Sequence, residues 1–283
     1  MLAEAPGEPL VRRLASGILL GAIGDPRIRV FDPPMVDIPS GRATIGLDPS
    51  QLDAVHARYA PFGLKREWFE KECPRFTVEL RGFRIGKYPI TNLEFLTFIQ
   101  ATGWSERPSS WSFGRFGFVA GNQPVHSVLP EAADAYAAWL SASTGRRFRL
   151  PTEYEWEYAA AGPEGRSFPW GEEFLEDHAN TAESRLSSTT PIGIFPKGSS
   201  IFGALDVAGN VEEYVADSYH PYPGGSLIED DFFKEMGPYR ITRGGAFNRL
   251  NDLARCHRRH GMDPKSHPAV GFRLAEDLPG RAG

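Results

Sequence analysis

Alternating apolar and polar positions begin at Met35 and predict strands in the first part of the chain. Residues 35–46 read Met-Val-Asp-Ile-Pro-Ser-Gly-Arg-Ala-Thr-Ile-Gly, with polar side chains between apolar ones and a Pro-Ser-Gly turn in the middle. Successive side chains of a strand point to opposite faces, so this pattern is typical of a half-buried hairpin. A similar alternation covers residues 76–90. We therefore expect a sheet to begin at Met35.

Three helices are predicted from the residues at their ends. Thr91 and Glu94 have the spacing of a capping box, in which both side chains accept hydrogen bonds from backbone amides at a helix start, and this helix should occupy 91–103. The same Thr and Glu spacing opens a helix over 152–162. Between them, 130–144 has Pro at its first turn, an Ala-rich body and Gly directly after it, which predicts a third helix.

The last third of the chain is rich in Gly, Pro and turn dipeptides. Short strand-like runs occur there at 239–247, 253–258 and 269–275. The 283 residues include 30 Gly and 24 Pro, and 12% are aromatic, which indicates a loop-rich fold in which aromatic side chains fill much of the core. We predict a single α+β domain over 34–277, with short helices, a small antiparallel sheet and a tail at 278–283.

An N-terminal appendage is expected over residues 1–33. Its apolar stretch at 14–24 is shorter than a membrane span, and Asp25-Pro26 follow it in place of a signal-peptide cleavage site. The pattern favours an amphipathic helix, although the glycines within it lower its helix propensity. The expected apolar stripe consists of Val11, Leu14, Leu19 and Ile23.

Charge is distributed unevenly although the total is modest. A net charge of -5 gives no general attraction to nucleic acid or to anionic lipid, so neither is an expected partner. Residues 204–236 carry eight Asp/Glu and one Lys, whereas 240–274 carry eight Lys/Arg and two Asp. We expect these two segments to face each other in the fold. The only cysteines, Cys73 and Cys256, have no metal or disulfide spacing, which fits a reducing, cytoplasmic location.

Short motifs follow one another in a characteristic order between residues 35 and 275. They lie at 87–92, 124–126, 149–160, 169–171, 209–214, 243–245 and 271–273. This succession resembles the formylglycine-generating enzyme (sulfatase-modifying factor) family. The resemblance implies an irregular C-type-lectin-like fold with little regular secondary structure and with calcium as a structural ion.

The resemblance also implies calcium ligands. Asn210 and Glu213 offer hard oxygen ligands, with the Val211 carbonyl between them, and such oxygens suit calcium. A second family site begins at Asn180 and Thr181. The stretch that follows them lacks the Asp that the family usually supplies, so this second site is incomplete in the chain.

Copper chemistry is where the chain departs from the family. The family's oxidase holds copper(I) with two cysteine thiolates shortly after the Arg-Gly-Gly motif, because soft ligands select copper(I). No cysteine lies between Gly245 and Arg255, and Cys256 stands alone, so copper is not expected. Iron stays possible. His257 and His260 would point to opposite sides of an extended strand, but a turn between them would let them converge.

Glu212 occupies a position where the family usually has Trp, and His257-Arg258 replace a small-aromatic pair. A carboxylate and a cation would stay charged in a packed region only with partners. Either a loop shift exposes them to solvent, or the Glu212 segment meets the basic 255–260 segment at a polar ligand site. Cys256, His257 and Glu212 are the weak catalytic candidates.

Two functions follow from the resemblance, and the residues do not decide whether the chain is an enzyme. In the first, which the missing copper-binding cysteine pair favours, it is a binding module for a ligand, most plausibly a protein or peptide with acidic groups. Binding would occur through a lectin-like C-terminal surface whose Arg249, Arg255, His257 and Arg258 face solvent. In the second, it is an oxygen-dependent oxidoreductase of the non-haem iron type that modifies a peptide or small molecule. An aromatic loop at 105–124 is a possible lid. The predicted ligand-binding residues are Asn248, Arg249, Asn251, Asp252, Arg255, His257, Arg258 and His260.

Overall fold

Short helices and short strands alternate along the chain in the computed structural model, which describes residues 2–261 and 268–278. The α-helices are α1 Leu10–Ile23, α2 Leu52–Tyr59, α3 Arg66–Glu70, α4 Asn92–Thr102, α5 Pro130–Thr144, α6 Glu153–Ala161 and α7 Asp231–Met236. The strands are β1 Met35–Ile38, β2 Gly41–Ile45, β3 Phe76–Leu80, β4 Phe83–Gly86, β5 Phe148–Arg149, β6 Glu212–Ser218, β7 Arg240–Arg243, β8 His260–Gly261, β9 Val270–Phe272 and β10 Ala275–Asp277. The α+β class with little regular structure is confirmed.

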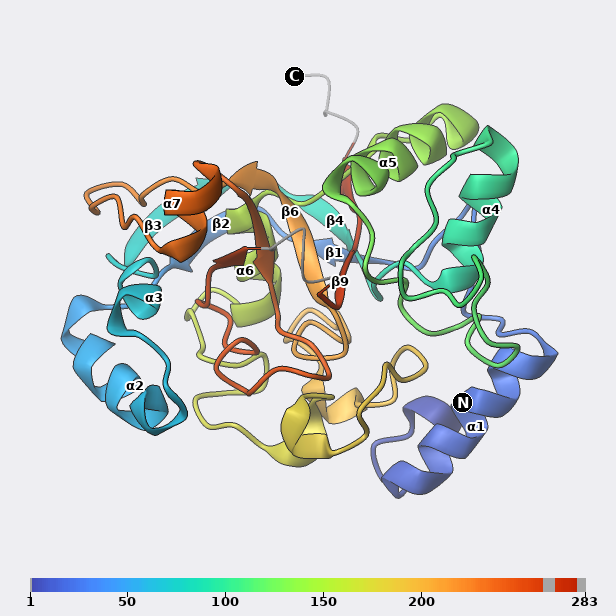
Figure 1. The fold of residues 1–283 in the computed structure, drawn as a ribbon, viewed down its shortest axis with the longest axis horizontal. Helices are drawn as coiled ribbons and strands as arrows, with labels where there is room; N and C mark the ends of the chain where they lie inside the picture. The colour runs from blue at the N-terminus through green and yellow to red at the C-terminus, as the bar shows by residue number, and fades with distance from the viewer. Residues whose placement is uncertain (1, 262–267, 279–283) are drawn as a thin grey trace.

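The strands form three small sheets. Their strand orders are β1-β4-β10-β5, β2-β3 and β8-β7-β6-β9. All pairs are antiparallel except β6 with β9, which is parallel and departs from the purely antiparallel prediction. Figure 1 shows α6, β6 and β9 near the centre, with α2 and α3 towards one end of the molecule and α4 and α5 towards the other.

The predicted hairpin at 35–46 is wrong in its pairing, although both strands exist. β1 pairs with β4 and β2 pairs with β3, so the two do not pair with each other. The register is the same in both ladders, since Ile38 lies opposite Phe83 and Gly41 opposite Leu80. β1 and β2 are therefore two halves of one bent strand, interrupted at Pro39, which has no amide hydrogen to donate to a ladder.

The capped helices form where the sequence predicts them. In α4 the Thr91 amide donates to the Glu94 carboxylate at 2.8 Å, and the Glu94 amide donates back to the Thr91 hydroxyl at 3.4 Å. α6 has the same reciprocal box between Thr152 and Glu155. These caps satisfy amides that have no partner within the helix, which is why the boundaries are readable in the sequence.

Other elements differ from the prediction. The helices α2, α3 and α7 lie in stretches where no helix is predicted from the sequence. The run 253–258 is a series of turns, not a strand, with backbone hydrogen bonds such as Ala254 to Asn251 and Arg258 to Arg255. Its alternation of small and basic side chains arises because the basic ones turn inward to buried carboxylates, as described below.

The helix α1 forms where the sequence favours an amphipathic helix, but it presents a different face. Val11, Leu19 and Ile23 are exposed, whereas Gly17 is buried. A Cβ on Gly17 would lie 2.8 Å from side-chain carbons of Ile194 and Pro191, closer than ordinary packing permits. The glycines that weaken the sequence signal therefore form the contact face. No helix in the described parts of the chain is long and apolar enough to cross a membrane.

Two large apolar clusters form the core. One surrounds α6 and contains Trp156 and Tyr158. The other joins α4 and α5 through Phe95 and Tyr136. The aromatic loop 105–124 packs against the core only in part. Its Trp111 and Phe116 pack on the second cluster, whereas Phe113 and Phe118 face solvent.

Candidate functional site

A cavity of about 500 Å³ lies between α3, α7 and the segment 248–260. These elements can be followed on one side of the molecule in Figure 1. Four members of the predicted ligand-binding set contribute to its wall. Its volume is in the range of small-molecule sites in proteins. The lining residues are Leu64, Trp68, Lys71, Asp230, Asp231, Phe232, Asn248, Arg249, Leu250, Asp252, Leu253 and His260.

A buried ion pair joins the two helices that flank the cavity. Lys71 directly follows α3, and its Nζ donates to the Asp230 carboxylate and, at 2.9 Å, to the Tyr239 hydroxyl. Asp230 is the N-cap of α7 and accepts the Phe233 amide at 3.0 Å. Burial, together with the nearby Arg258, lowers the pKa of Lys71 to about 8. The pair therefore fixes the position of α7 against α3.

Glu212 and His260 form a hydrogen-bonded pair beside the cavity. Glu212 begins β6, and Thr242 of β7 lies opposite His260 of β8 in the sheet register. One Glu212 oxygen, Oε2, lies 2.8 Å from His260 Nδ1 and accepts the Thr242 hydroxyl at 2.7 Å. The other, Oε1, is buried without a hydrogen bond, 3.5 Å from Arg249 Nε. The strand order thus brings a buried carboxylate and an imidazole to the cavity edge.

The protonation states of this pair follow from its surroundings. Burial acts to raise the pKa of Glu212, but His260, Arg249 and the Thr242 hydroxyl favour the ionised form, and the net result is a lowered pKa. An ionised carboxylate has no proton to donate, so His260 Nδ1 is the donor. The opposite nitrogen, Nε2, is then an acceptor when the ring is neutral.

Most of the predicted recognition surface is buried, which corrects the sequence interpretation. Arg255, His257 and Arg258 are 3%, 4% and 2% exposed, so the expectation that they face solvent is wrong. Each has a carboxylate partner: Arg255 binds Glu72 at 3.1 Å, His257 binds Glu157 and Arg258 binds Asp252. Of the predicted set, Asn248 is exposed, and Arg249, Asn251 and His260 are partly exposed.

Asn251 is also held within the protein. Its side-chain nitrogen Nδ2 donates to Glu183 at 2.9 Å, and its side-chain oxygen Oδ1 accepts the Tyr59 hydroxyl at 2.8 Å. Both polar ends of the Asn251 side chain therefore have hydrogen-bond partners within the protein, so this residue of the predicted ligand-binding set has a structural role.

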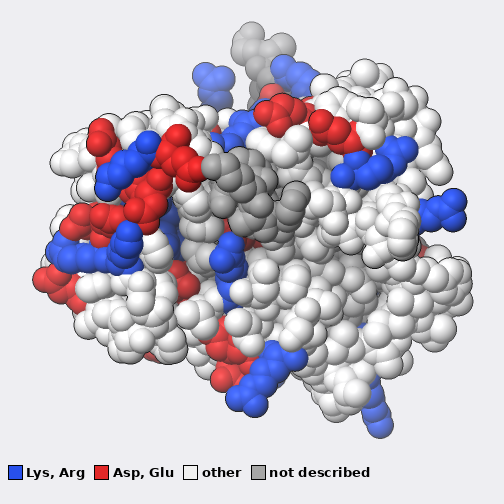
Figure 2. All heavy atoms as spheres, in the orientation of Figure 1, with Lys and Arg blue, Asp and Glu red and all other residues white. Residues whose placement is uncertain are grey.

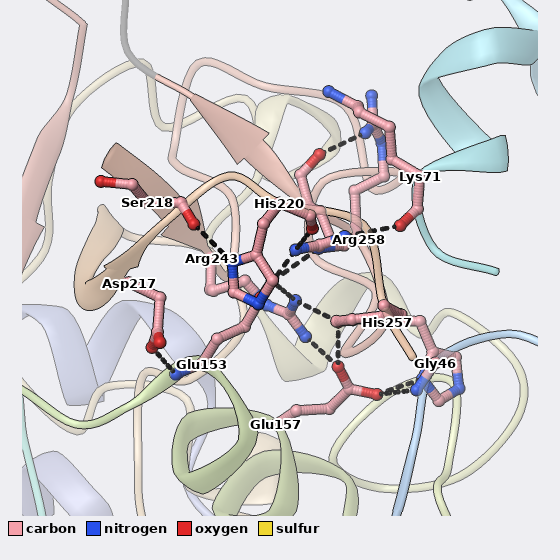
Figure 3. A network of polar contacts seen from close by, with 12 residues as sticks. Gly46, Lys71, Glu153, Glu157, Asp217, Ser218, His220, Arg243, His257 and Arg258 are labelled. Atoms are coloured by element: carbon pink, nitrogen blue, oxygen red, sulfur yellow. Dashed lines mark hydrogen bonds and ion pairs between the residues drawn. The ribbon is translucent and has the colours of Figure 1, made fainter. Parts of the chain in front are cut away.

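A buried ionic network lies behind this segment (Figure 3). Arg243 donates to Glu153 at 2.8 Å and to Glu157, and Arg259 also donates to Glu153. Glu157 further accepts the Gly46 amide at 2.7 Å and lies 2.9 Å from His257 Nδ1. Burial alone would raise the pKa of Glu157, but Arg243 and His257 lower it to about 2. The network joins segments that are far apart along the chain, and its charged side chains are buried.

The weak catalytic candidates are separated by this arrangement. Cys256 is fully buried, and burial raises the pKa of its thiol, which disfavours the reactive thiolate. His257 is committed to Glu157 inside the network. Glu212 is 1% exposed, so exposure after a loop shift is wrong, and it meets the basic segment through His260. Of the three candidates, only Glu212 is connected to the cavity wall, through its contact with His260.

Surface charge is mixed over this side of the molecule. In the face drawn in Figure 2, acidic and basic side chains alternate over the region of α2, α3 and α7, while the opposite lower part is largely uncharged. Pairs such as Lys65 with Asp231 and Arg66 with Asp53 contribute to this pattern. This face therefore does not carry charge of a single sign.

The predicted calcium ligands have other partners. The Glu213 carboxylate accepts Arg273 Nε at 2.6 Å and Trp156 Nε1 at 2.7 Å. Asn210 Oδ1 accepts the Thr190 amide at 2.9 Å and also Asn180 Nδ2. Thr181 donates to Glu183. Because the Arg273 guanidinium already occupies the Glu213 carboxylate, the side chains of the predicted site, which also includes the Val211 carbonyl, do not fit calcium coordination.

The predicted transition-metal ligands do not converge either. His257 and His260 bind different carboxylates, Glu157 and Glu212. Cys73 and Cys256 are both free thiols and belong to different apolar clusters. Across residues 2–261 and 268–278, no three His, Cys, Asp or Glu side chains are grouped to hold a metal ion. The described residues therefore do not fit an iron or copper centre.

The family assignment rests on most of the sequence. Residues 26–278 match the Sulfatase-modifying factor enzyme 1-like domain family. The chain belongs to this family. The match begins before Met35 and ends at the last described residue, so it includes every strand given above.

Curated relatives of differing names share this domain. The chain is 34% identical over 227 residues to the serine/threonine-protein kinase Pkn1 of Chlamydia trachomatis, covering 73% of the chain and 35% of that protein. It is 33% identical over 244 residues to hercynine oxygenase of Mycobacterium tuberculosis, covering 74% and 56%. Formylglycine-generating enzyme of Streptomyces coelicolor is 31% identical over 267 residues, covering 73% and 82%. The chain thus spans about half or less of the first two proteins.

Solved structures agree with the fold. PvdO from Pseudomonas aeruginosa superposes with a TM-score of 0.66 at 29% identity, covering 88% of this chain and 95% of PvdO. Treponema denticola variable protein 1 superposes with a TM-score of 0.63 at 20% identity, covering 86% and 94%, which bears on the fold alone. The sulfatase-modifying-factor type of fold is therefore established for the chain.

Sequence reasoning missed the α3 and α7 half of the cavity. Lys71 and Trp68 lie on or after α3, and Asp230 and Phe232 lie at the start of α7. The one available signal was Asp230-Asp231 before two phenylalanines, since Asp is a preferred N-cap. The burial of Lys71 had no signal in the sequence, because its partner is 159 residues away.

Proposed function

We propose that this chain binds a small organic or peptide ligand in the cavity between α3, α7 and segment 248–260, and that His260 exchanges a proton with that ligand. The observation that carries the proposal is the Glu212–His260 pair at the cavity wall. Since Nδ1 faces the buried Glu212 and His260 lines the cavity, the proposal assigns the contact with the ligand to Nε2.

The pair has the arrangement of a general base and its orienting group. His260 Nε2 accepts a proton from a ligand hydroxyl, thiol or ammonium, and the ionised Glu212 stabilises the resulting imidazolium. Thr242 holds the carboxylate in place through its hydroxyl. Proton transfer by a positioned imidazole typically contributes about 10²–10⁴-fold to a rate.

Oxidation of the ligand by molecular oxygen is the second candidate function. Relatives named hercynine oxygenase and formylglycine-generating enzyme, at 33% and 31% identity, favour it. Removal of a proton by His260 is compatible with such a reaction, but the described residues supply no metal ligands for an oxygen-activating centre. An oxygen electrode distinguishes the two functions: binding alone leaves dissolved oxygen constant when the ligand is added.

Chemical labelling tests the main proposal. Diethyl pyrocarbonate acylates accessible imidazole nitrogens, and peptide mass spectrometry locates the product. We expect His260 to react readily and His257, which is 4% exposed, to react only after unfolding. Compounds that bind in the cavity, drawn from a set containing anionic, cationic, neutral and zwitterionic members, should protect His260. The His260→Gln variant, with melting as the check of its fold, removes the label.

Two results would contradict the proposal. One is a His260 as unreactive as His257 in the folded protein, because the Nε2 edge would then be closed to ligands. The other is protection by none of the compounds in the set, at concentrations that saturate ordinary small-molecule sites.

A further inference from the structure

We propose that the ligand of this cavity carries one carboxylate on an apolar body, and that the Arg249 guanidinium binds this carboxylate. This choice of ligand class rests on the proposed function above. The carboxylate is a binding group, distinct from the hydroxyl, thiol or ammonium that exchanges a proton with His260. What points to it is the set of charged groups on the cavity wall, most of which already have partners within the protein.

Each carboxylate of the cavity wall is paired with a cationic side chain of the protein. The pairs are Asp230 with Lys71, Asp231 with Lys65 at 2.7 Å and Asp252 with Arg258 at 3.3 Å. The same pairs occupy the wall's one ammonium, since Lys71 Nζ donates to the Asp230 carboxylate and to the Tyr239 hydroxyl. Among the described residues, the wall therefore offers a ligand cation no carboxylate that lacks a counter-charge.

Arg249 differs from the other arginines of segment 248–260. Those three are buried, and each donates to a carboxylate. Arg249 lines the cavity with 38% of its side chain exposed, and its guanidinium makes no hydrogen bond within the described parts of the chain. A guanidinium presents its donors in a planar fork that matches the two oxygens of a carboxylate. Arg249 can therefore bind a ligand carboxylate without giving up a hydrogen bond to the protein.

Glu212 is the carboxylate paired with Arg249, but it does not occupy the guanidinium. Its Oε1 lies 3.5 Å from Arg249 Nε, longer than the usual separation of about 2.7–2.9 Å in a charge-assisted hydrogen bond. Its Oε2 is used by His260 and Thr242. Because Nε is buried on the Glu212 side, the exposed part of Arg249 lies elsewhere on the side chain. The proposal assigns the ligand contact to the two terminal nitrogens.

The rest of the wall determines the body of the ligand and its number of charges. Trp68 and Phe232 supply aromatic surface, and three leucines supply aliphatic surface. A cavity of about 500 Å³ accommodates a phenyl ring with a short acidic side chain. A second negative charge on the ligand would find no unpaired cation among the described wall residues and would lie near their carboxylates, which is unfavourable. A carboxylate therefore suits this site better than a dianionic phosphate.

Calorimetric titration with four probes of similar size tests the ligand class. The probe 3-phenylpropionate carries the carboxylate, and 3-phenylpropionamide is its neutral counterpart. The amine 3-phenylpropylamine carries a positive charge, and 2-phenylethylphosphonate carries a group that can ionise twice. We expect 3-phenylpropionate to bind at least about tenfold more tightly than the amide or the amine, and more tightly than the phosphonate.

Variants of Arg249 test where the carboxylate binds. Arg249→Gln should remove the preference for 3-phenylpropionate over the amide and leave the affinity for the amide unchanged. Arg249→Lys should retain part of the preference, because it keeps the charge but lacks the planar fork. Arg84→Gln is the matched control and should retain the full preference. Arg84 is 41% exposed and is likewise paired with a carboxylate, that of Asp37, but it does not line the cavity.

Three outcomes overturn the ligand class. They are equal or weaker binding of 3-phenylpropionate relative to the amide or the amine, an undiminished preference in an Arg249→Gln protein that melts like the wild type, and binding of none of the probes at millimolar concentration. The labelling of His260 separates this result from the proposed function. Protection of His260 by the amide or the amine, with no effect of 3-phenylpropionate, would contradict the carboxylate and leave proton exchange standing. Tight, Arg249-dependent binding of 3-phenylpropionate beside an unreactive His260 would do the reverse.

Discussion

At the scale of single residues, Glu213 illustrates how a sequence motif can be identified correctly and its partner missed. The resemblance implies a calcium ligand at this position. In the structure both carboxylate oxygens bind Arg273, at 2.6 Å each, and Trp156 donates to one of them. Arg273 is fully buried. The guanidinium therefore supplies the positive charge that a calcium ion would otherwise bring.

Removal of this carboxylate should leave a buried guanidinium without its partner. We expect Glu213→Ala to lower the free energy of unfolding by about 3–5 kcal/mol, measured by urea denaturation. Asp37→Ala, which removes the partner of the partly exposed Arg84, should cost less than about 1 kcal/mol. Excess chelator should not change the melting temperature of the wild type. A chelator-dependent loss that is absent in Glu213→Ala would restore calcium at this loop.

The same lesson applies to the basic segment. Its residue types were apparent, but its burial depended on carboxylates far away in the chain: Glu72 is 183 residues from Arg255, and Glu157 is 100 residues from His257. No local pattern carries such pairings. Glu212 could be singled out because it departs from the family pattern, and His260 because it lies in the predicted ligand-binding segment, whereas Lys71 and Trp68 had no motif to mark them.

At the scale of elements, local signals predicted what local interactions determine. Caps and a terminal Gly fixed α4, α5 and α6, because the groups they satisfy lie within three or four residues. Strand pairing depends on contacts across the chain, so β1 and β2 were recognised but paired wrongly. In α1, apolar periodicity suggested a buried stripe, yet close approach at glycine decides which face packs.

The packing of α1 gives a prediction about Gly21. A Cβ at this position would lie 2.3 Å from the Val119 carbonyl oxygen, which is backbone and cannot rotate away. Gly21→Ala should therefore destabilise the protein, by about 1–3 kcal/mol as for other overpacked sites, although Ala is the better helix former. Gly7→Ala, where a Cβ meets nothing within 4 Å, is the matched control. Equal melting of the two variants would mean that α1 is not held against 119–122 in solution.

At the scale of the whole molecule, the two oppositely charged segments do meet, but only in part. Glu213 binds Arg273, and Glu212 lies beside His260 and Arg249. Three other basic residues of the segment, Arg243, Arg255 and Arg259, instead pair with Glu157, Glu72 and Glu153, which lie outside the acidic segment. The uneven distribution of charge along the sequence therefore correctly indicated that the two segments touch. It did not indicate that most of the basic side chains pair with other elements of the fold.

One buried carboxyl outside these pairs makes stability depend on pH. Asp206 is buried near Arg273, and its Oδ2 accepts the Gly193 amide at 2.7 Å. Burial raises the pKa of Asp206 from its ordinary value of 3.8 to about 6. Between these two values the folded state holds a proton that the unfolded state has released, so the stability that Asp206 contributes is lost as pH rises through about 6.

Asp206→Asn should remove this dependence without disturbing the backbone. Asn keeps an oxygen for the Gly193 amide, has no proton to release, and tolerates the positive φ of 55° at this position. We expect the free energy of unfolding of the wild type, relative to the variant, to increase when pH is lowered from 7 to 5, both values being obtained by urea denaturation in the same buffer ions. Parallel pH profiles for the two proteins would show that Asp206 titrates as an ordinary carboxyl, and that its enclosure is relieved in solution.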